Sequence, residues 1–274
     1  MTMEKVKISD VRDFWNKESC GERYLKSDGQ SIDYDAEETN RYSLEPYIKE
    51  FAKFDDMHGR IVLEVGVGMG CDHLQIAKSE PSSLHGIDLT DRAISHTRAR
   101  LSSRNYDSNL SVDSAENLSF EDNKFDVVYS WGALHHSENP QKCFDEVRRV
   151  LKPGGVAKIM IYNKYSLTGF YLWIKYGFLT GRLNKSMREI YANHLESPGT
   201  KAYTLSEAKF MFREFDAVDV KIQLSFGDLL LGEVGERHQG LLLSIGRKLL
   251  PRLLLKMVNR IIPIGLYLLI IAKK

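Results

Sequence analysis

The sequence predicts an α/β fold in which a seven-stranded, mostly parallel sheet is sandwiched by helices and the last strand runs antiparallel. Short apolar segments alternate with helical periods between residues 59 and 162, a pattern typical of strand–helix–strand crossover units. The apolar segments are nearly continuous, as in strands buried on both faces. A glycine-rich turn joins the first strand to the helix that follows it. The length of 274 residues is enough for one such domain with added segments.

Seven strands and four helices account for this alternation. The predicted strands cover 61–63, 84–89, 110–112, 125–130, 156–162, 218–226 and 266–272. The predicted helices cover 71–79, 90–103, 140–151 and 204–215. Thr90 is the expected N-cap of the second helix, and Thr204 with Glu207 forms a capping-box pattern at the last one. A turn is expected at 152–155, where Lys-Pro-Gly-Gly precedes the fifth strand.

Three segments lie outside the alternating pattern and are expected to cover or complete the core. The first is polar with two short helical periods, the second is rich in aromatic side chains without a clear period, and the third includes an amphipathic stretch. The expected division is an N-terminal helical cap at 1–58, a core at 59–162, an inserted substrate-cap segment at 163–203, and a C-terminal part of the core at 204–274 with an inserted amphipathic helical segment at 227–263.

Composition limits the class of protein. The net charge is +1, whereas proteins that grip nucleic acid by its phosphates usually carry a clear basic excess, so no nucleic-acid partner is expected. The spacing of Cys20, Cys71 and Cys143 matches no metal motif, and no metal ion is expected. The first ten residues are charged and lack the apolar centre of a signal peptide. We therefore expect a cytoplasmic protein with free thiols.

The glycine-rich turn predicts a nucleotide-like ligand. Gly66, Gly68 and Gly70 stand between a strand and a helix, where glycine permits positive φ and lets a ligand approach the backbone. The helix N-terminus then directs free N–H groups at that ligand. The run E-x-G-x-G-x-G differs from the G-x-G-x-x-G of dinucleotide sites, and Glu64 places a carboxylate where a pyrophosphate would be repelled. An acid here suits the ammonium and sulfonium groups of S-adenosylmethionine.

A second acid follows about twenty residues later. Asp88, with Leu89 after it, ends the second predicted strand, where a carboxylate can accept hydrogen bonds from both hydroxyls of a ribose. An acid at this point is common to NAD and S-adenosylmethionine sites, so Asp88 alone does not choose between them. An ordinary helix cap is the alternative interpretation of this residue.

These motifs resemble the class I S-adenosylmethionine-dependent methyltransferases, of the type 11 group that contains the ubiquinone/menaquinone C-methyltransferases. Val62–Gly70 is similar to the first motif of the family, 112–120 to its DAExLPF stretch, 125–136 to its fourth-strand motif and 150–155 to its VLKPGG turn. Ser119 stands where the family usually has proline, and a local change of the loop is expected there. The resemblance implies a Rossmann-like fold with S-adenosylmethionine as cofactor.

The resemblance also implies roles for individual residues. Asp88 occupies the position of the ribose-binding acid, Asp113 and the backbone after it are expected at the adenine, and Ser130 and Trp131 beside the methionine part. The predicted cofactor-binding residues are Glu64, Gly66, Gly68, Gly70, Asp88, Leu89, Asp113, Ser114, Ala115, Glu116, Ser130 and Trp131. The segments outside the core are not shared with the quinone methyltransferases, so the methyl acceptor stays open.

Methyl transfer from a sulfonium is a direct displacement, which requires alignment of the reacting atoms and exclusion of water. A general base contributes where the acceptor atom carries a proton. His135 and His136 follow the fourth strand at the ligand-binding edge of the sheet and are the predicted catalytic residues. The alternative is that this pair only shapes the pocket. Tyr34, Tyr42 and His194 are candidate substrate contacts, with ordinary surface roles as the alternative.

A basic stripe is expected near the C-terminus. Lys248, Arg252, Lys256 and Arg260 recur every four residues, so they would share one face of a helix at 248–262 whose other positions are mostly apolar. This pattern is typical of a helix on an anionic membrane surface, and the alternative is a solvated face of a helix packed on the domain. The charges interrupt any run of about 20 apolar residues, so a membrane-spanning helix is not expected.

The sequence therefore predicts an enzyme that transfers a methyl group from S-adenosylmethionine to an oxygen, nitrogen or carbon of a small apolar molecule, of natural-product or lipid/quinone type. Two alternatives stay open at this point: a methyltransferase that acts on protein or RNA, and a non-catalytic or NAD-binding module that keeps the same fold. The sequence makes no prediction about the oligomeric state.

Overall fold

The computed structural model describes residues 6–19, 22, 33–229, 255, 259 and 261–274. In this part of the chain a seven-stranded sheet has the order β3-β2-β1-β4-β5-β7-β6. The strands are β1 (Ile61–Val65), β2 (Ser83–Asp88), β3 (Asn109–Val112), β4 (Phe125–Trp131), β5 (Leu151–Tyr162), β6 (Ala217–Gln223) and β7 (Tyr267–Lys273). β1 to β5 pair in parallel, whereas β7 runs antiparallel to both β5 and β6. The predicted fold class is confirmed.

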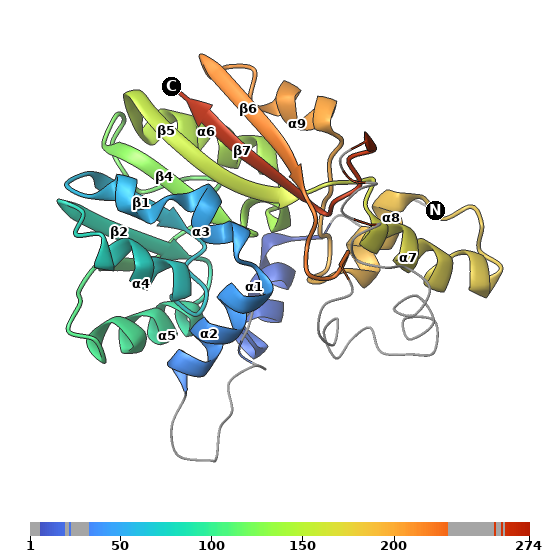
Figure 1. Ribbon diagram of the computed structural model, residues 1–274, viewed down its shortest axis with the longest axis horizontal. Helices are drawn as coiled ribbons and strands as arrows, with labels where there is room; N and C mark the ends of the chain where they lie inside the picture. The colour runs from blue at the N-terminus through green and yellow to red at the C-terminus, as the bar shows by residue number, and fades with distance from the viewer. Residues whose placement is uncertain (1–5, 20–21, 23–32, 230–254, 256–258, 260) are drawn as a thin grey trace.

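Helices cover both faces of the sheet (Figure 1). They are α1 (Ile8–Lys17), α2 (Tyr34–Leu44), α3 (Tyr47–Ala52), α4 (Cys71–Lys78), α5 (Asp91–Ser102), α6 (Pro140–Val150), α7 (Leu167–Tyr176), α8 (Met187–His194) and α9 (Leu205–Met211), with short 3₁₀ turns η2 (Phe54–Met57), η3 (Leu134–His136) and η4 (Phe178–Thr180). Successive strand side chains point to opposite faces, so Val62 packs with α3, α4 and α5 while Leu63 packs with α6 and α9. The result is two apolar cores, one on each side of the sheet.

Two predicted helix starts are confirmed. The Thr90 hydroxyl accepts a hydrogen bond from the N–H of Ala93 at 3.2 Å, which caps α5. Thr204 and Glu207 form the expected capping box, because each side chain accepts the other residue's N–H. The helix that follows Thr204 ends at Met211, earlier than predicted.

The predicted turn at 152–155 lies inside β5. Phe125 pairs with Leu151 and Val127 pairs with Val156, so β5 has extra residues opposite β4 and bulges outward there. Gly154 has φ +79°, a value that favours glycine. The motif is therefore a bulge in a long strand instead of a separate turn.

The segment 163–203 contains two helices, α7 and α8, where the sequence showed no clear period. Figure 1 shows them side by side, next to the end of the sheet. The period of α7 was hidden because apolar and aromatic side chains occur nearly all round it. A sequence signal for α8 was present in the capping box of Ser186 and Glu189.

Other expectations concern the N-terminal helices, the thiols and the membrane. The described part of the segment 1–58, where two helical periods were expected, contains three α-helices, because α2 ends at Leu44 and α3 starts after its N-cap Pro46. Cys71 and Cys143 are free and buried. The basic stripe Lys248, Arg252, Lys256 and Arg260 and the thiol of Cys20 lie outside the described residues. Within the described part of the chain, no helix is long and apolar enough to cross a membrane.

Candidate active site

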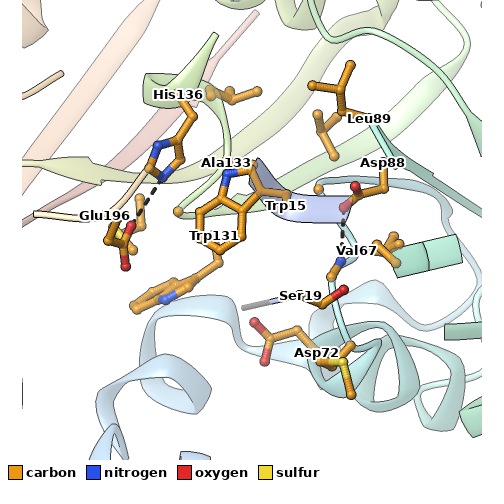
Figure 2. A pocket seen from close by; sticks show the side chains of 18 of the residues that line it. Trp15, Ser19, Val67, Asp72, Asp88, Leu89, Trp131, Ala133, His136 and Glu196 are labelled. Atoms are coloured by element: carbon orange, nitrogen blue, oxygen red, sulfur yellow. Dashed lines mark hydrogen bonds and ion pairs between the residues drawn. The ribbon is translucent and has the colours of Figure 1, made fainter. Parts of the chain in front are cut away.

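A cavity of about 390 Å³ lies at the carboxyl edge of the sheet, walled by the β1–α4 turn, the loops after β2, β3 and β4, and helices α1 and α2. Figure 2 shows side chains from these elements directed toward a shared space. The predicted site residues that line it are Glu64, Gly66, Gly68, Asp88, Leu89, Asp113, Ser114, Ala115, Glu116, Trp131 and His136. The predicted residues outside the lining are Gly70, Ser130, His135, Tyr34, Tyr42 and His194.

The three glycines of the β1–α4 turn all have positive φ but meet different surroundings. A Cβ on Gly66 would lie 2.3 Å from the Cβ of Ala133, and one on Gly70 would lie 2.8 Å from the Cα of Thr97. A Cβ on Gly68 would meet no atom within 4 Å, because its face opens into the cavity. Gly66 and Gly70 therefore permit close packing of the chain, whereas Gly68 leaves room for a ligand.

Asp88 holds the glycine turn against the end of β2. Its Oδ2 accepts the N–H of Gly68 at 3.1 Å, and its Oδ1 accepts the N–H and the hydroxyl of Thr90 at 3.0 and 2.9 Å. Burial raises the pKa of the Asp88 carboxyl. Since each carboxylate oxygen has more than one lone pair and the group lines the cavity, Asp88 can also accept from a ligand hydroxyl.

Glu64 is paired with a histidine that sequence reasoning did not identify. Its Oε2 lies 2.8 Å from Nδ1 of His73 on α4, and Nε2 of the same ring lies 2.8 Å from the hydroxyl of Ser108. Burial raises the pKa of Glu64 well above its usual value and lowers that of His73 to about 3, so both groups favour their neutral forms. Glu64 thus ties β1 to α4 and orients the turn between them.

The loop after β3 is held by its own carboxylate. Asp113 accepts the N–H of Ser114 at 2.8 Å and the N–H of Ser119 at 2.9 Å. Proline has no N–H, so the departure from the family pattern at Ser119 adds a hydrogen bond that closes this loop. Glu116 accepts the N–H of Asn139 at 2.9 Å, which joins the loop to the start of α6.

Asp72 anchors the N-terminal helices to the core. Its carboxylate accepts from Nε and Nη2 of Arg41 at 3.2 and 2.7 Å, and from the hydroxyls of Tyr42 and Tyr129 at 2.8 and 2.9 Å. Tyr42 was predicted as a substrate contact, but its hydroxyl donates to Asp72 and Tyr42 itself does not line the cavity. The second such tyrosine, Tyr34, packs on α5, where the guanidinium of Arg100 lies 4.7 Å from the centre of its ring.

Ser130 and His194 also have structural surroundings. The Ser130 hydroxyl donates to the carbonyl of Val65 at 2.8 Å and joins β4 to β1 beneath the cavity. The His194 ring stacks on Tyr176 with centroids 4.0 Å apart, within the α7–α8 pair. Neither side chain lines the cavity.

The two adjacent histidines lie in different environments. His136 lines the cavity, and its Nε2 lies 3.2 Å from Oε2 of Glu196 (Figure 2). Its Nδ1 lies 2.7 Å from the hydroxyl of Ser197 and 3.1 Å from that of Thr200. Buried hydroxyls therefore hold the ring at Nδ1, whereas Nε2 faces Glu196 on the cavity side and makes no hydrogen bond among the described residues.

His135 lies behind His136, fully buried, with its ring centroid 4.2 Å from that of Tyr162. Neither of its nitrogens has a hydrogen-bond partner in the described part of the chain, and burial lowers its pKa well below the usual value. The side-chain ligand atoms of His135, His136 and Glu196 lie within 4.8 Å of one another, so this set could also hold a metal ion. Sequence reasoning missed Glu196, because it lies 60 residues from His136 in a loop without a motif.

The rest of the lining divides by chemistry. Beside His136 it is apolar and aromatic, with Trp15, Trp131, Tyr162, Leu195 and Tyr267. The acidic side chains of the lining are Glu18, Glu37, Glu45, Glu64, Asp72, Asp88, Asp113, Glu116 and Glu196. Arg41 is the one Lys or Arg among the described residues of the lining. Glu64 favours its neutral form, and Asp72 and Glu37 are paired with Arg41 and Arg100. The other carboxylates of the lining still favour a cationic ligand over the anionic pyrophosphate of a dinucleotide.

The fold and this cavity define a Rossmann-like domain that binds a nucleotide-type cofactor at the carboxyl edge of its sheet. Residues 62–155 match the family described as a methyltransferase domain. The matched region is therefore a methyltransferase domain of the class I S-adenosylmethionine-dependent type.

Curated relatives also match part of the chain. Phosphoethanolamine N-methyltransferase 2 of Caenorhabditis elegans is 35% identical over 119 residues, which are 43% of this chain and 26% of that protein. Fatty-acid O-methyltransferase of Mycolicibacterium smegmatis is 33% identical over 122 residues, 44% of this chain and 43% of that protein. The match thus spans less than half the length of either relative.

Among solved structures, the fold is similar to that of phosphoethanolamine N-methyltransferase 2 of Haemonchus contortus in complex with phosphomonomethylethanolamine and S-adenosylhomocysteine. The TM-score is 0.53 at 20% identity, over 85% of this chain and 52% of that one. At this identity the likeness extends to the fold alone.

Proposed function

We propose that this chain is an enzyme that transfers a methyl group from S-adenosylmethionine to a small, uncharged, apolar acceptor. One observation carries the proposal. A single cavity joins a half suited to the cofactor with an aromatic half that contains the His136–Glu196 pair.

The cofactor half is formed by the glycine turn, Asp88 and the loop from Asp113 to Glu116. The open face of Gly68 leaves space beside the backbone, and the Asp88 carboxylate is available to ribose hydroxyls. The acidic lining suits the positive charges of S-adenosylmethionine. When bound, this cofactor supplies a methyl group on a sulfonium sulfur, which an acceptor atom displaces.

The acceptor half lies between two added segments of the chain. α1 contributes Val11 and Trp15, and the segment 163–203 contributes Thr168, Leu195 and Glu196. This supports the roles of 1–58 as an N-terminal cap and of 163–203 as a substrate cap. The aromatic walls would exclude water and favour an apolar acceptor. A phosphorylated acceptor would meet the acidic side chains with little basic charge to balance it.

Nε2 of His136, which faces the cavity without a hydrogen bond among the described residues, can take the proton of an acceptor hydroxyl or amine as the acceptor oxygen or nitrogen bonds to the methyl carbon. The carboxylate of Glu196 would stabilise the imidazolium that forms, and Ser197 and Thr200 would keep the ring in place. This proposal assigns the catalytic role to His136, which lines the cavity, and a packing role to His135, which does not.

Calorimetry and a transfer assay test the proposal. We expect S-adenosylmethionine and S-adenosylhomocysteine to bind and NAD not to bind. Radiolabelled S-adenosylmethionine should then transfer its methyl group to an alkylphenol more readily than to a fatty acid, and least to phosphoethanolamine. Binding of NAD without S-adenosylmethionine would refute the enzyme itself. A preference for phosphoethanolamine would refute the uncharged, apolar acceptor.

A further inference from the structure

Large apolar side chains are exposed along one stretch of the chain, from Tyr165 just before α7 to Leu183 in the loop before α8. Each is more than half exposed: Tyr165 (61%), Phe170 (58%), Phe178 (56%), Leu179 (61%) and Leu183 (60%). Single exposed hydrophobic residues are common on protein surfaces, whereas a group of this size usually marks a site of interaction. We call these five residues, together with Lys164, Lys175, Arg182, Lys185 and Arg188, the α7 surface.

α7 itself is apolar on its outer side as well as its inner side. Leu172 is fully buried, but Phe170 is exposed and Tyr171 and Trp173 are only partly covered. Lys175 is the single charged residue of the helix. A helix that is apolar nearly all round is normally buried on all sides, so the exposed side of α7 fits an apolar or interfacial environment.

The charge around this surface has one sign. No aspartate or glutamate occurs between Glu146 and Glu189. The basic residues of the α7 surface are Lys164, Lys175, Arg182, Lys185 and Arg188. Within the described part of the chain, Lys164 lies 3.8 Å from Glu207 and Lys185 is near enough to Glu189 to help lower the pKa of that carboxyl, whereas Lys175, Arg182 and Arg188 form no ion pair. The basic charge is therefore largely unbalanced.

The α7 surface stands on a well-packed base. The Nε1 of Trp173 donates to the carbonyl of Lys185 at 3.1 Å, which ties α7 to the loop before α8. A Cβ on Gly169 would lie 2.1 Å from the hydroxyl oxygen of Tyr191, so α7 and α8 approach closely. Because the base is fixed by these contacts, the exposed side chains keep one arrangement and need little ordering to bind.

We propose that the α7 surface binds the surface of an anionic lipid bilayer. Aromatic and leucine side chains insert at the headgroup level, while lysine and arginine attract anionic lipids, and the α7 surface has both kinds. A second copy of this chain is the less suitable occupant, since a two-fold interface would bring basic residues against basic residues. With no spanning helix in the described residues, the contact would be peripheral.

The α7 surface is also the outer side of the proposed acceptor site. Thr168 at the start of α7 and Leu195 just after α8 line the cavity, whereas Phe170 and Phe178 point to solvent. A bilayer bound at this surface would bring a membrane-dissolved acceptor close to the cavity. This consequence rests on the proposed function, but membrane binding itself does not, because it can be measured without any acceptor.

The experiment is co-sedimentation of the full chain with vesicles of phosphatidylcholine alone or with about a third phosphatidylglycerol. We expect binding to the anionic vesicles, weakened by salt. Phe170→Ser with Phe178→Ser should lower the affinity at least about tenfold. Arg182→Glu with Lys185→Glu should lower it at least about 25-fold, since each basic residue near the membrane contributes about fivefold.

Matched controls come from α9, which also has an exposed aromatic and an exposed basic residue, Phe210 and Lys209. Phe210→Ser and Lys209→Glu should leave vesicle binding unchanged. Unchanged binding of S-adenosylhomocysteine would show that each variant is folded. The same measurement tests cofactor binding, and with it the proposed function, separately from membrane binding.

Three results would overturn the proposal: no binding of the parent protein to anionic vesicles, equal losses in the α9 controls, or full binding by the α7-surface variants. If the α7-surface variants bind fully and the double variant Arg252→Glu with Lys256→Glu does not bind, the membrane contact belongs to the basic stripe instead. Dimerisation in solution that disappears in the α7-surface variants, without vesicle binding, would equally refute it.

Discussion

Nε2 of His136 lies 3.2 Å from Oε2 of Glu196, and both side chains line the cavity. Glu196 follows α8, whereas His136 follows β4, so the sheet and the α7–α8 pair each supply one partner. The hydroxyls of Ser197 and Thr200 on the other side of the ring limit its rotation. The hydroxyls thus orient the imidazole, and the Glu196 carboxylate lies where it would stabilise a proton taken up at Nε2.

Glu196→Gln tests this relationship. The amide keeps the shape but cannot stabilise an imidazolium, so we expect the kcat for a hydroxyl acceptor to fall by about 10²-fold or more with cofactor affinity unchanged. Single-turnover kinetics and calorimetry with S-adenosylhomocysteine measure the two effects. Glu121→Gln, at an exposed position, is the control. An unchanged rate in Glu196→Gln would show that the pair does not accept the proton.

Asp88→Ala should weaken cofactor binding at least about tenfold, because it removes the expected ribose contact and the hydrogen bond to the N–H of Gly68. Asp88→Asn keeps the shape and one acceptor oxygen, so a smaller loss is expected. Titration with S-adenosylhomocysteine measures both variants. Equal affinity of Asp88→Ala and the parent protein would leave Asp88 with only the structural role of holding Gly68 and Thr90.

The core of this fold could be predicted because its signals are local. The apolar strands, the positive-φ glycines and the Thr90 and Thr204 caps each depend on neighbouring residues, and all appear in the structure. α7 was missed for the opposite reason. Phe170 and Trp173 stand on the side of α7 that is polar in an ordinary surface helix, so the sequence shows no alternation of apolar and polar faces. These side chains belong to the exposed apolar surface of the helix.

The site was only partly predictable, because its key partners come from distant segments. Asp72, His73 and Glu196 have no motif, and they became visible only when the fold placed them beside Arg41, Glu64 and His136. Tyr42 shows the converse. It was selected as a tyrosine near the site, but its hydroxyl hydrogen-bonds to Asp72, which a sequence cannot specify.

Alanine at Gly68 and at Gly70 should have different effects although both glycines belong to one motif. At Gly70 a Cβ would meet the Cα of Thr97 at 2.8 Å and φ is +75°, so the free energy of unfolding should fall by about 2–4 kcal/mol. At Gly68 the new methyl group enters the cavity, so the free energy of unfolding should fall by about 1–2 kcal/mol. The affinity for the cofactor should fall more in this variant than in the Gly70 variant. Urea denaturation and calorimetry measure the two effects. The same ratio of stability loss to affinity loss in both variants would contradict these assignments.

His135→Phe should make the protein less sensitive to acid. Folding keeps His135 neutral because burial lowers its pKa well below the usual value, whereas the unfolded chain takes up a proton near pH 6.5. As the pH falls below that value, the unfolded state gains protons that the folded state does not. The free energy of unfolding therefore falls by up to about 1.4 kcal/mol per pH unit. Phenylalanine removes this contribution and preserves the packing against Tyr162.

Urea denaturation of the parent protein and His135→Phe between pH 8 and pH 5 measures this slope. The gain of the variant over the parent should increase steadily as the pH falls below 6.5. His58→Gln is the control, since the side chain of His58 is 71% exposed. Parallel stability curves for His135→Phe and the parent would show that His135 is not held neutral. Loss of methyl transfer in a stably folded His135→Phe would return the catalytic role to this residue, because a packing residue behind His136 should retain most of the activity when its shape is preserved.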